Sequence, residues 1–401
     1  MNLNSPVSAG RIHIGFFGKC NAGKSSLVNA VTSQAMSVVS EVKGTTTDPV
    51  KQAMELLPLG PVVILDTPGL DDEGDLGALR VERARRMLAQ TNIAVLVADA
   101  CAGLQDTDQW LLQELKARNI PCVVALNKAD LLADRPLPPG DAIYVSAATG
   151  EGVAALKERL GQFARQLEMP GCLIRDLLSP GDLVVLVTPI DEAAPKGRLI
   201  LPQQMVLRDV LDAHATAVVC QTAELTATLD ALGRKPRMVI TDSQIFGAVD
   251  RLVPADVPLT SFSILMARHK GELATLISGF FMLEQLQDGD RALICEGCTH
   301  HRQCNDIGTV KMPGWIRRIC GAEPVFHFTS GSDFPQDLSP YRVIVHCGGC
   351  MLNQAEMKHR IRLAAEAGVP IVNYGVAIAG MHGVLRRSLA LFPELRQCAA
   401  P

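Results

Sequence analysis

The sequence has few aromatic residues and no excess of positive charge. Tryptophan, tyrosine and phenylalanine make up 4% of its 401 residues, and the formal net charge is -4. Proteins dedicated to nucleic-acid binding usually show a basic surface, often interleaved with aromatic side chains. We therefore expect no nucleic-acid partner.

Long hydrophobic runs are also lacking. No apolar run reaches the roughly 18 residues that suggest a membrane-spanning helix, and residues 1–10 lack the basic and apolar regions of a signal peptide. These absences predict a cytoplasmic protein with no membrane partner. In that compartment the 12 cysteines are not expected to form a disulfide framework.

The first motif in the chain is a phosphate-binding loop. An apolar strand at residues 11–18 runs into Gly18-x-x-x-x-Gly23-Lys24-Ser25, and apolar residues follow at helical spacing. Strand, glycine-rich loop and helix in this order predict a P-loop, whose backbone N–H groups bind phosphate oxygens. Lys24 is expected to neutralise the β- and γ-phosphates, and the Ser25 hydroxyl to bind Mg²⁺.

Two motifs that would contact the γ-phosphate follow the P-loop. Thr46 lies in a polar loop where a first switch is expected, and it is the candidate for closing on Mg²⁺ and the γ-phosphate. A strand at residues 62–65 leads into Asp66-Thr-Pro-Gly69, which would place a carboxylate near Mg²⁺ and an N–H group near the γ-phosphate. Lys24, Thr46 and Gly69 are therefore the candidate catalytic residues.

Two later motifs predict recognition of guanine. A strand at residues 122–126 ends in Asn127-Lys128-Ala-Asp130, whose last carboxylate can accept two hydrogen bonds from the guanine edge. The backbone of Ser146-Ala147 can meet the guanine O6. The motifs together predict a GTPase that converts GTP to GDP and phosphate. Its candidate binding residues are Gly18, Asn21, Gly23, Lys24, Ser25, Ser26, Thr46, Asp66, Gly69, Asn127, Lys128, Asp130, Ser146 and Ala147.

Two details of this domain concern the rate of hydrolysis. Leu70 stands where many small GTPases carry a glutamine that orients water, so we expect slow intrinsic hydrolysis. Asn21 in the P-loop, together with Gly44-Thr-Thr, resembles the potassium-activated GTPases of the MnmE type. That resemblance implies a K⁺ ion, held by Asn21 against the phosphates, that speeds hydrolysis.

The middle of the chain alternates strands and helices but carries no P-loop and no catalytic constellation. Residues 166–180 mix turn and apolar residues and are interpreted as a linker. Residues 181–263 are predicted to form a small α/β domain with a scaffold or dimerisation role, ending in a strand at residues 259–264. One long helix with an apolar stripe is predicted next, at residues 267–286.

Soft metal ligands gather in the last third of the chain. Seven of the 12 cysteines and six of the nine histidines lie from Cys295 onward. Predicted strands at residues 291–294 and 341–345 lead into Cys298-Thr-His300 and into His346-Cys347-Gly-Gly-Cys350. The carboxyl ends of parallel strands are where open α/β sheets hold ligands. The sequence therefore predicts a metal site at this edge.

The residues alone leave two metals open. Cys295 and Cys298 with Cys347 and Cys350 form two C-x-x-C pairs that could hold zinc. Cys298, Cys347 and Cys350 could instead bind a [4Fe-4S] cluster, with an exchangeable fourth ligand and with glycines that let the backbone approach. A zinc domain behind a GTPase would suit an RNA- or ribosome-associated GTPase, which is the alternative function.

The whole arrangement resembles the HydF family of [FeFe]-hydrogenase maturation GTPases. The resemblance rests on Cys-x-His, a gap of 45 residues and His-Cys-x-x-Cys, behind a GTPase domain of the K⁺ type. It implies an α/β protein of three domains: a P-loop GTPase with a mostly parallel sheet (residues 1–165), a dimerisation domain (residues 181–263) and a [4Fe-4S] cluster-binding domain (residues 264–401).

The resemblance also implies ligands and partners. Cys298, Cys347 and Cys350 would hold the [4Fe-4S] cluster, with His300 or His346 as a possible fourth ligand or as a neighbour of the cluster. The protein would be a homodimeric scaffold and carrier. It would receive a transient di-iron precursor, made with the radical-SAM maturases HydE and HydG, and deliver it to apo-[FeFe]-hydrogenase.

Overall fold

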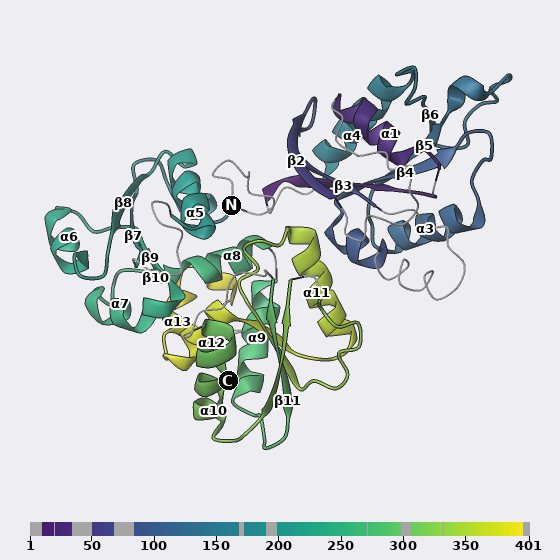
Figure 1. Cartoon of the computed structure of the whole chain (residues 1–401). Coiled ribbons are helices and arrows are strands. Elements are labelled where there is room, and N and C mark those ends of the chain that lie inside the picture. The colour runs from purple at the N-terminus through teal and green to yellow at the C-terminus, as the bar shows by residue number, and fades with distance from the viewer. Residues whose placement is uncertain are drawn as a thin grey trace. The chain divides into compact units, whose positions relative to one another are not determined.

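The computed structural model divides the chain into two compact units, Met1–Met169 and Pro170–Pro401 (Figure 1). It describes residues 10–19, 21–33, 50–67, 84–167, 172–189, 199–270, 272–297, 306–331 and 333–395. Among the described residues, every helix is too short or too polar to span a bilayer.

The first unit is built on a six-stranded sheet in the order β2-β3-β1-β4-β5-β6. Its strands are β1 (Ile12–Phe17), β2 (Val50–Leu56), β3 (Gly60–Asp66), β4 (Ile93–Asp99), β5 (Cys122–Asn127) and β6 (Ile143–Tyr144). Only β2 pairs in the antiparallel sense. Its helices include α1 (Lys24–Thr32), α3 (Asp106–Ala117) and α4 (Val153–Gln166), and residues 84–90 are also helical. The predicted mostly parallel sheet is confirmed.

Alternation along the strands explains why helices cover both faces of this sheet. In β1, Ile14 and Phe16 belong to one apolar cluster that includes residues of α1 and α4, whereas Phe17 belongs to a second that includes residues of α3. Successive side chains of a strand point to opposite faces. A strand that is apolar on both faces must therefore be buried on both.

The second unit contains two four-stranded sheets with every strand parallel. The first comprises β7 (Leu183–Val187), β8 (Thr216–Cys220), β9 (Met238–Thr241) and β10 (Leu259–Ser261), in the order β10-β9-β7-β8. The second comprises β11 (Arg291–Glu296), β12 (Val325–Ser330), β13 (Val343–His346) and β14 (Ile371–Asn373), in the order β12-β11-β13-β14. In each sheet the first strand lies between the second and the third.

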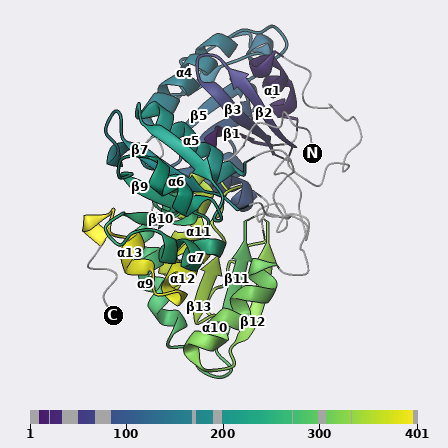
Figure 2. The ribbon, with the colours of Figure 1, turned by 90° about the vertical axis from the view of Figure 1, so that its left-hand side faces the viewer.

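Helices join these two sheets into one unit. They are α5 (Leu201–Asp212), α6 (Leu225–Ala231), α7 (Phe246–Leu252), α8 (Phe262–Lys270), α9 (Leu273–Leu283), α10 (Met312–Cys320), α11 (Gln354–Glu366), α12 (Tyr374–Met381) and α13 (Leu385–Ser388). One continuous apolar core includes residues of both sheets, as well as Leu173 and Ile174 from the stretch interpreted as a linker. Figure 2 shows β11, β12 and β13 side by side.

Two predicted elements are wrong at the junction between these sheets. The strand predicted at residues 259–264 ends at Ser261, and α8 begins at once with Phe262. The single helix predicted at residues 267–286 is two helices, because Glu272 has a φ of 121°, which no α-helix accommodates. The apolar stripe is nevertheless buried along α9.

Candidate nucleotide and metal sites

Backbone geometry fixes the P-loop between β1 and α1. Gly18 has a φ of 141°, and a Cβ atom there would lie 2.1 Å from the carbonyl oxygen of Val97. Gly23 has a φ of 83°, and a Cβ atom there would lie 2.3 Å from Nδ2 of Asn127. Only glycine fits such positions without strain. Asn21 also adopts a left-handed φ, of 64°, which asparagine tolerates, and its side chain is exposed.

Lys24 is buried at the start of α1 and folds back over its own loop. Its Nζ donates hydrogen bonds to the carbonyl oxygens of Gly18 and Lys19, each at 2.9 Å. The adjacent Ser25 hydroxyl donates to Oδ2 of Asp66 at 3.2 Å. The hydroxyl and the carboxylate predicted to serve Mg²⁺ thus lie in contact, and the lysine predicted to serve the phosphates lies beside them.

Asn127 ties the P-loop to the loop predicted to hold guanine. Its Nδ2 donates to the carbonyl oxygen of Ala22 at 2.9 Å, and its Oδ1 accepts from the backbone N–H of Ala147 at 3.0 Å. Lys128 pairs with Asp99 at 2.7 Å. Partial burial of Asp99 opposes ionisation, but the bond from Lys128 holds the pKa of Asp99 below its usual value. The hydrogen bonds of Asn127 and the ion pair of Lys128 hold the residues at the end of β5 in place.

The remaining predicted nucleotide residues occupy the expected elements where they are described. Asp130 is exposed just after β5, Ser146 is buried after β6, and Ser26 is exposed on α1. Thr46 and Gly69 fall outside the described residues. The structure therefore gathers the P-loop, Asp66 and the guanine motifs but describes neither switch residue.

Four strand ends of the last sheet meet at one edge. Cys295 of β11 is in register with His346 of β13, which is in register with Asn373 of β14, and Glu296 is in register with Ser330 of β12. After β11, the chain adds β12 on one side of it and then β13 and β14 on the other side. The order in which strands are added therefore reverses between β11 and β13, which leaves a crevice there. That crevice is where doubly wound sheets bind ligands. The two predicted metal-binding segments begin on either side of it.

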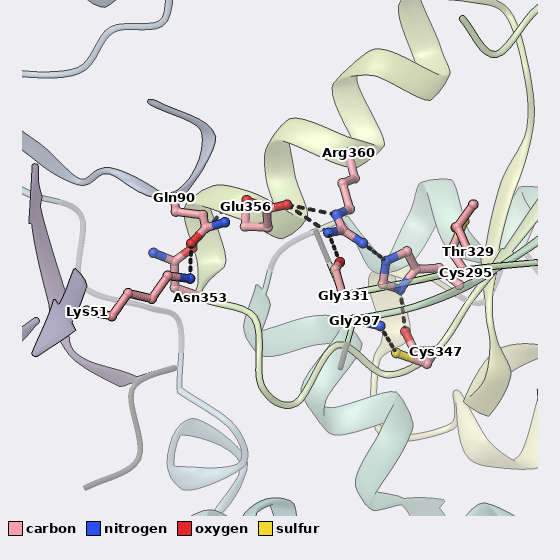
Figure 3. A network of polar contacts seen from close by, with 11 residues as sticks. Lys51, Gln90, Cys295, Gly297, Thr329, Gly331, Cys347, Asn353, Glu356 and Arg360 are labelled. Atoms are coloured by element: carbon pink, nitrogen blue, oxygen red, sulfur yellow. Dashed lines mark hydrogen bonds and ion pairs between the residues drawn. The ribbon is translucent and has the colours of Figure 1, made fainter. Parts of the chain in front are cut away.

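Cys347 is the thiol around which this edge is organised. Its Sγ accepts a hydrogen bond from the backbone N–H group of Gly297 at 3.0 Å (Figure 3). It accepts a second hydrogen bond from the backbone N–H group of Gly349 at 3.3 Å. Burial raises the pKa of the Cys347 thiol, and the two N–H donors oppose that rise. Paired N–H donors stabilise a sulfur that carries negative charge, as in a metal thiolate.

Both ring nitrogens of His346 have partners. Its Nδ1 lies 2.7 Å from the carbonyl oxygen of Cys347, and its Nε2 lies 3.0 Å from Nη1 of Arg360. Because Nδ1 must donate to the carbonyl, Nε2 must accept from the guanidinium. Burial, and then the charge of Arg360, lower the pKa of His346 to about 3. In this arrangement the neutral ring holds the Cys347 backbone and offers no free lone pair to a metal.

Arg360 is a buried cation with a full set of contacts. Glu356, one turn earlier on α11, lies 2.9 Å from its guanidinium, which also donates to the carbonyl oxygen of Gly331 at 2.8 Å (Figure 3). The guanidinium also lies 5.1 Å from the ring centroid of Phe334. The charge of Arg360 is therefore balanced by Glu356, and its geometry positions His346.

Tyr374 places an unsatisfied hydroxyl near the same edge. Its oxygen is buried and has no hydrogen-bond partner among the described residues. A Cβ atom on Gly308 would lie 2.4 Å from this oxygen and 2.5 Å from Oε1 of Glu296. Burial, and then the negative charges of Cys347 and Glu296, raise the pKa of Tyr374. A buried hydroxyl without a partner near this edge fits a site that receives a further acceptor.

Cys298 and His300 fall outside the described residues, as does Cys304. Among the residues that are described, no group of three or more potential metal-binding side chains comes together. Cys350 lies four residues beyond β13. Cys295 lies inside β11, where it is fully buried and accepts a hydrogen bond from Thr329, and burial raises its pKa to about 12.

Sequence reasoning missed the side chains that support this edge, namely Arg360, Glu356, Tyr374 and Lys270. All four lie on helices, where nothing in the local pattern marks them as inward-facing. The available signal was a polar residue at a helical position that shares a face with apolar residues. Arg360 stands four residues after Glu356, with Met357 and Ile361 buried alongside.

Matches to known families cover most of the chain. Residues 274–391 match the hydrogen maturase F tetramerization domain, and residues 173–271 match the hydrogen maturase F dimerization domain. Residues 13–128 match the 50S ribosome-binding GTPase family. The two hydrogen maturase F matches together span more than half of the chain. The names of both domains indicate self-association. The name of the tetramerization domain, at residues 274–391, does not mention the predicted cluster.

Individual relatives resemble the GTPase part. The tRNA modification GTPase MnmE of Nitratidesulfovibrio vulgaris (strain DP4) is 36% identical over 144 residues, which are 35% of this chain and 31% of that protein. GTPase Der of Kosmotoga olearia is 29% identical over 189 residues, or 42% of each protein. A crystal structure of an Aquifex aeolicus Era variant bound to GDP.AlF4- is 20% identical and covers 52% of this chain and 92% of that one, with a TM-score of 0.35.

The chain thus spans about a third of the length of the MnmE relative. The GTPase domain supports GTP hydrolysis with Mg²⁺ as the metal. The two domains that follow it are those of one family of hydrogenase maturation proteins, as the resemblance implied. The chain belongs to the hydrogen maturase F (HydF) family.

Proposed function

We propose that this GTPase is the scaffold and carrier of hydrogenase maturation. It would hold a [4Fe-4S] cluster through Cys298, Cys347 and Cys350, receive a di-iron precursor made with HydE and HydG, and deliver it to apo-[FeFe]-hydrogenase. The observation that carries the proposal is the pair of N–H groups directed at Cys347 in the crevice between β11 and β13.

The surroundings of Cys347 suit an anionic metal centre. Two N–H donors, the buried Tyr374 hydroxyl and the buried ammonium of Lys270 all lie around this loop. When bound, a [4Fe-4S] cluster supplies a redox-active iron centre with one position free for exchange. Because His346 is engaged at both nitrogens, we assign it to holding the Cys347 backbone rather than to ligation of iron.

GTP hydrolysis would act through conformation. In switch GTPases, the loops that the γ-phosphate orders relax once it is lost. Such a change is suited to timing the loading or release of the precursor, and it needs no chemical step at the cluster. We therefore assign control of loading and release to the nucleotide, and binding of the metal centre to the thiolates.

Metal analysis and EPR of the anaerobically purified, full-length protein test this function. About four irons per chain and a fast-relaxing signal from the reduced protein are expected for one [4Fe-4S] cluster. About one zinc and no iron would contradict the proposal and favour an RNA- or ribosome-associated GTPase with a structural zinc domain. Activation of apo-hydrogenase by the loaded protein then tests the carrier role.

Hydrolysis is expected to be slow and K⁺-dependent. The side chain of Asn21 is exposed on a left-handed turn of the P-loop, where it is free to meet an ion beside the phosphates. Steady-state hydrolysis should be several-fold faster in K⁺ than in Na⁺ at equal ionic strength, since the ion adds positive charge where the transition state gains negative charge. Asn21→Ala should remove the difference. Equal wild-type rates in both salts would contradict K⁺ activation.

The homodimer is proposed to form through the sheet of β7 to β10. Its edge strand β8 carries no charged residue, and Val219 on it is 43% exposed. An unprotected edge readily pairs with a second chain. Val219→Lys is expected to yield a smaller assembly by analytical ultracentrifugation, because lysine blocks edge pairing. Leu252→Lys, at a residue that is 41% exposed on α7, is the matched control. An unchanged mass for Val219→Lys would place the interface elsewhere.

A further inference from the structure

Lys270 is a buried lysine that reaches the metal-binding loop from another sheet's helix. It is the last residue of α8, which follows directly on β10. Its Nζ donates hydrogen bonds to the carbonyl oxygen of Gly349 and, at 2.6 Å, to that of Leu352. Gly349 lies between Cys347 and Cys350, so the ammonium is fixed to the backbone of the thiolate-bearing loop.

The ammonium has no carboxylate partner among the described residues. Lys270 is 4% exposed, and burial lowers its pKa to about 8, whereas the nearby sulfurs of Cys350 and Cys347 favour its charged form. The other buried cation nearby, Arg360, is already balanced by Glu356. A buried positive charge is costly unless a negative charge lies close. The loop that Lys270 holds is therefore suited to carry a net negative centre.

The position of α8 makes this contact a link between domains. The helix packs against α5 and β10 on the side of the β7–β10 sheet, and against α11 and α12 on the side of the β11–β14 sheet. Residue 270 falls within the match to the dimerization domain, whereas Cys347 and Cys350 fall within the next match. The metal-binding loop thus depends on a side chain from the domain before it.

We propose that Lys270 is a positioning residue of the metal centre, which fixes the Cys347–Cys350 loop through two carbonyl groups and supplies the positive charge that balances an anionic cluster. The inference rests on the proposed function, since it needs a cluster at these cysteines. It assigns to Lys270 two separable effects. The hydrogen bonds retain the cluster, and the charge raises its reduction potential, because reduction adds one negative charge.

The test compares Lys270→Met, Lys270→Gln and Lys358→Met in the full-length chain, reconstituted anaerobically with ferrous iron and sulfide. Lys270→Met removes the charge and both hydrogen bonds. Lys270→Gln removes the charge but keeps an N–H donor for the carbonyl groups. Lys358 is exposed on α11, so its substitution changes the net charge equally without touching the loop. The readouts are iron retained against a chelator and the midpoint potential from EPR-monitored titration.

We expect Lys270→Met to retain the cluster about tenfold less well than wild type, as is usual when a residue that supports a metal ligand is lost. Both Lys270 variants should titrate at a more negative potential, with Lys270→Gln retaining more iron than Lys270→Met. Lys358→Met should match wild type. If Lys270→Met fails to fold by circular dichroism, the potential of Lys270→Gln decides.

A wild-type potential in Lys270→Gln, or wild-type iron retention in folded Lys270→Met, would overturn the inference while leaving the proposed function in place. Absence of a cluster from the wild-type protein would instead overturn the proposed function, and the role of Lys270 with it. Failure of the inference is thus detected in the Lys270 variants, and failure of the proposed function in the wild-type protein.

Discussion

Lys24→Ala is expected to lower the rate of GTP hydrolysis by about a hundredfold or more, the loss typical when a charged group that stabilises a transition state is removed. The ammonium is buried at the start of α1 and held to its loop by two carbonyl groups, at 2.9 Å each. It is therefore already placed where the phosphates are expected to bind. Phosphate release under saturating GTP measures the effect.

The control for Lys24→Ala is Lys116→Ala, which removes an exposed lysine from the last turn of α3. It should hydrolyse GTP as the wild type does. Iron content should be unchanged in both variants, because the P-loop and the cysteines belong to different compact units. Hydrolysis by Lys24→Ala at the wild-type rate would show that Lys24 does not act on the phosphates.

Cys350→Ser is expected to abolish stable cluster binding and activation of apo-hydrogenase, while GTP hydrolysis stays nearly unchanged. Serine replaces a soft thiolate with a hydroxyl that binds iron poorly at neutral pH. Iron per chain and the EPR signal measure the first effect, and phosphate release measures the second.

Cys101→Ser is the matched control for Cys350→Ser, since Cys101 is an exposed free thiol of the first unit. It should leave both iron content and hydrolysis at wild-type values. A fall in the hydrolysis rate of Cys350→Ser that parallels its loss of iron would contradict the proposal that GTP hydrolysis and cluster binding belong to separate units.

Local signals made much of the fold predictable. The P-loop follows a short apolar strand, and Asp66 and Asn127 each end one, so motif and element could be placed together. The strands β12 and β14 escaped because β12 is half-exposed at the sheet edge and β14 has only three residues. The break at Glu272 escaped because the apolar stripe continues through it, and a backbone angle leaves no trace in such a pattern.

The contacts that support the proposed metal site join residues that are far apart in the sequence. Lys270 and Gly349 are 79 positions apart, and Gly297 and Cys347 are 50 apart. Periodicity reports which residues of one element share a face, but not which elements meet. The cysteines could thus be proposed as ligands from their spacing, whereas the contacts of Lys270 and Arg360 required the fold.

The continuous core of the second unit limits how the protein can be dissected. Family matches place a boundary between residues 271 and 274, yet apolar side chains from β7 through β14 pack in a single core across it. A recombinant fragment that begins at residue 274 would lose α8, expose part of that core and leave Lys270 behind. Studies of the proposed metal centre in isolation therefore need a fragment that begins near residue 172.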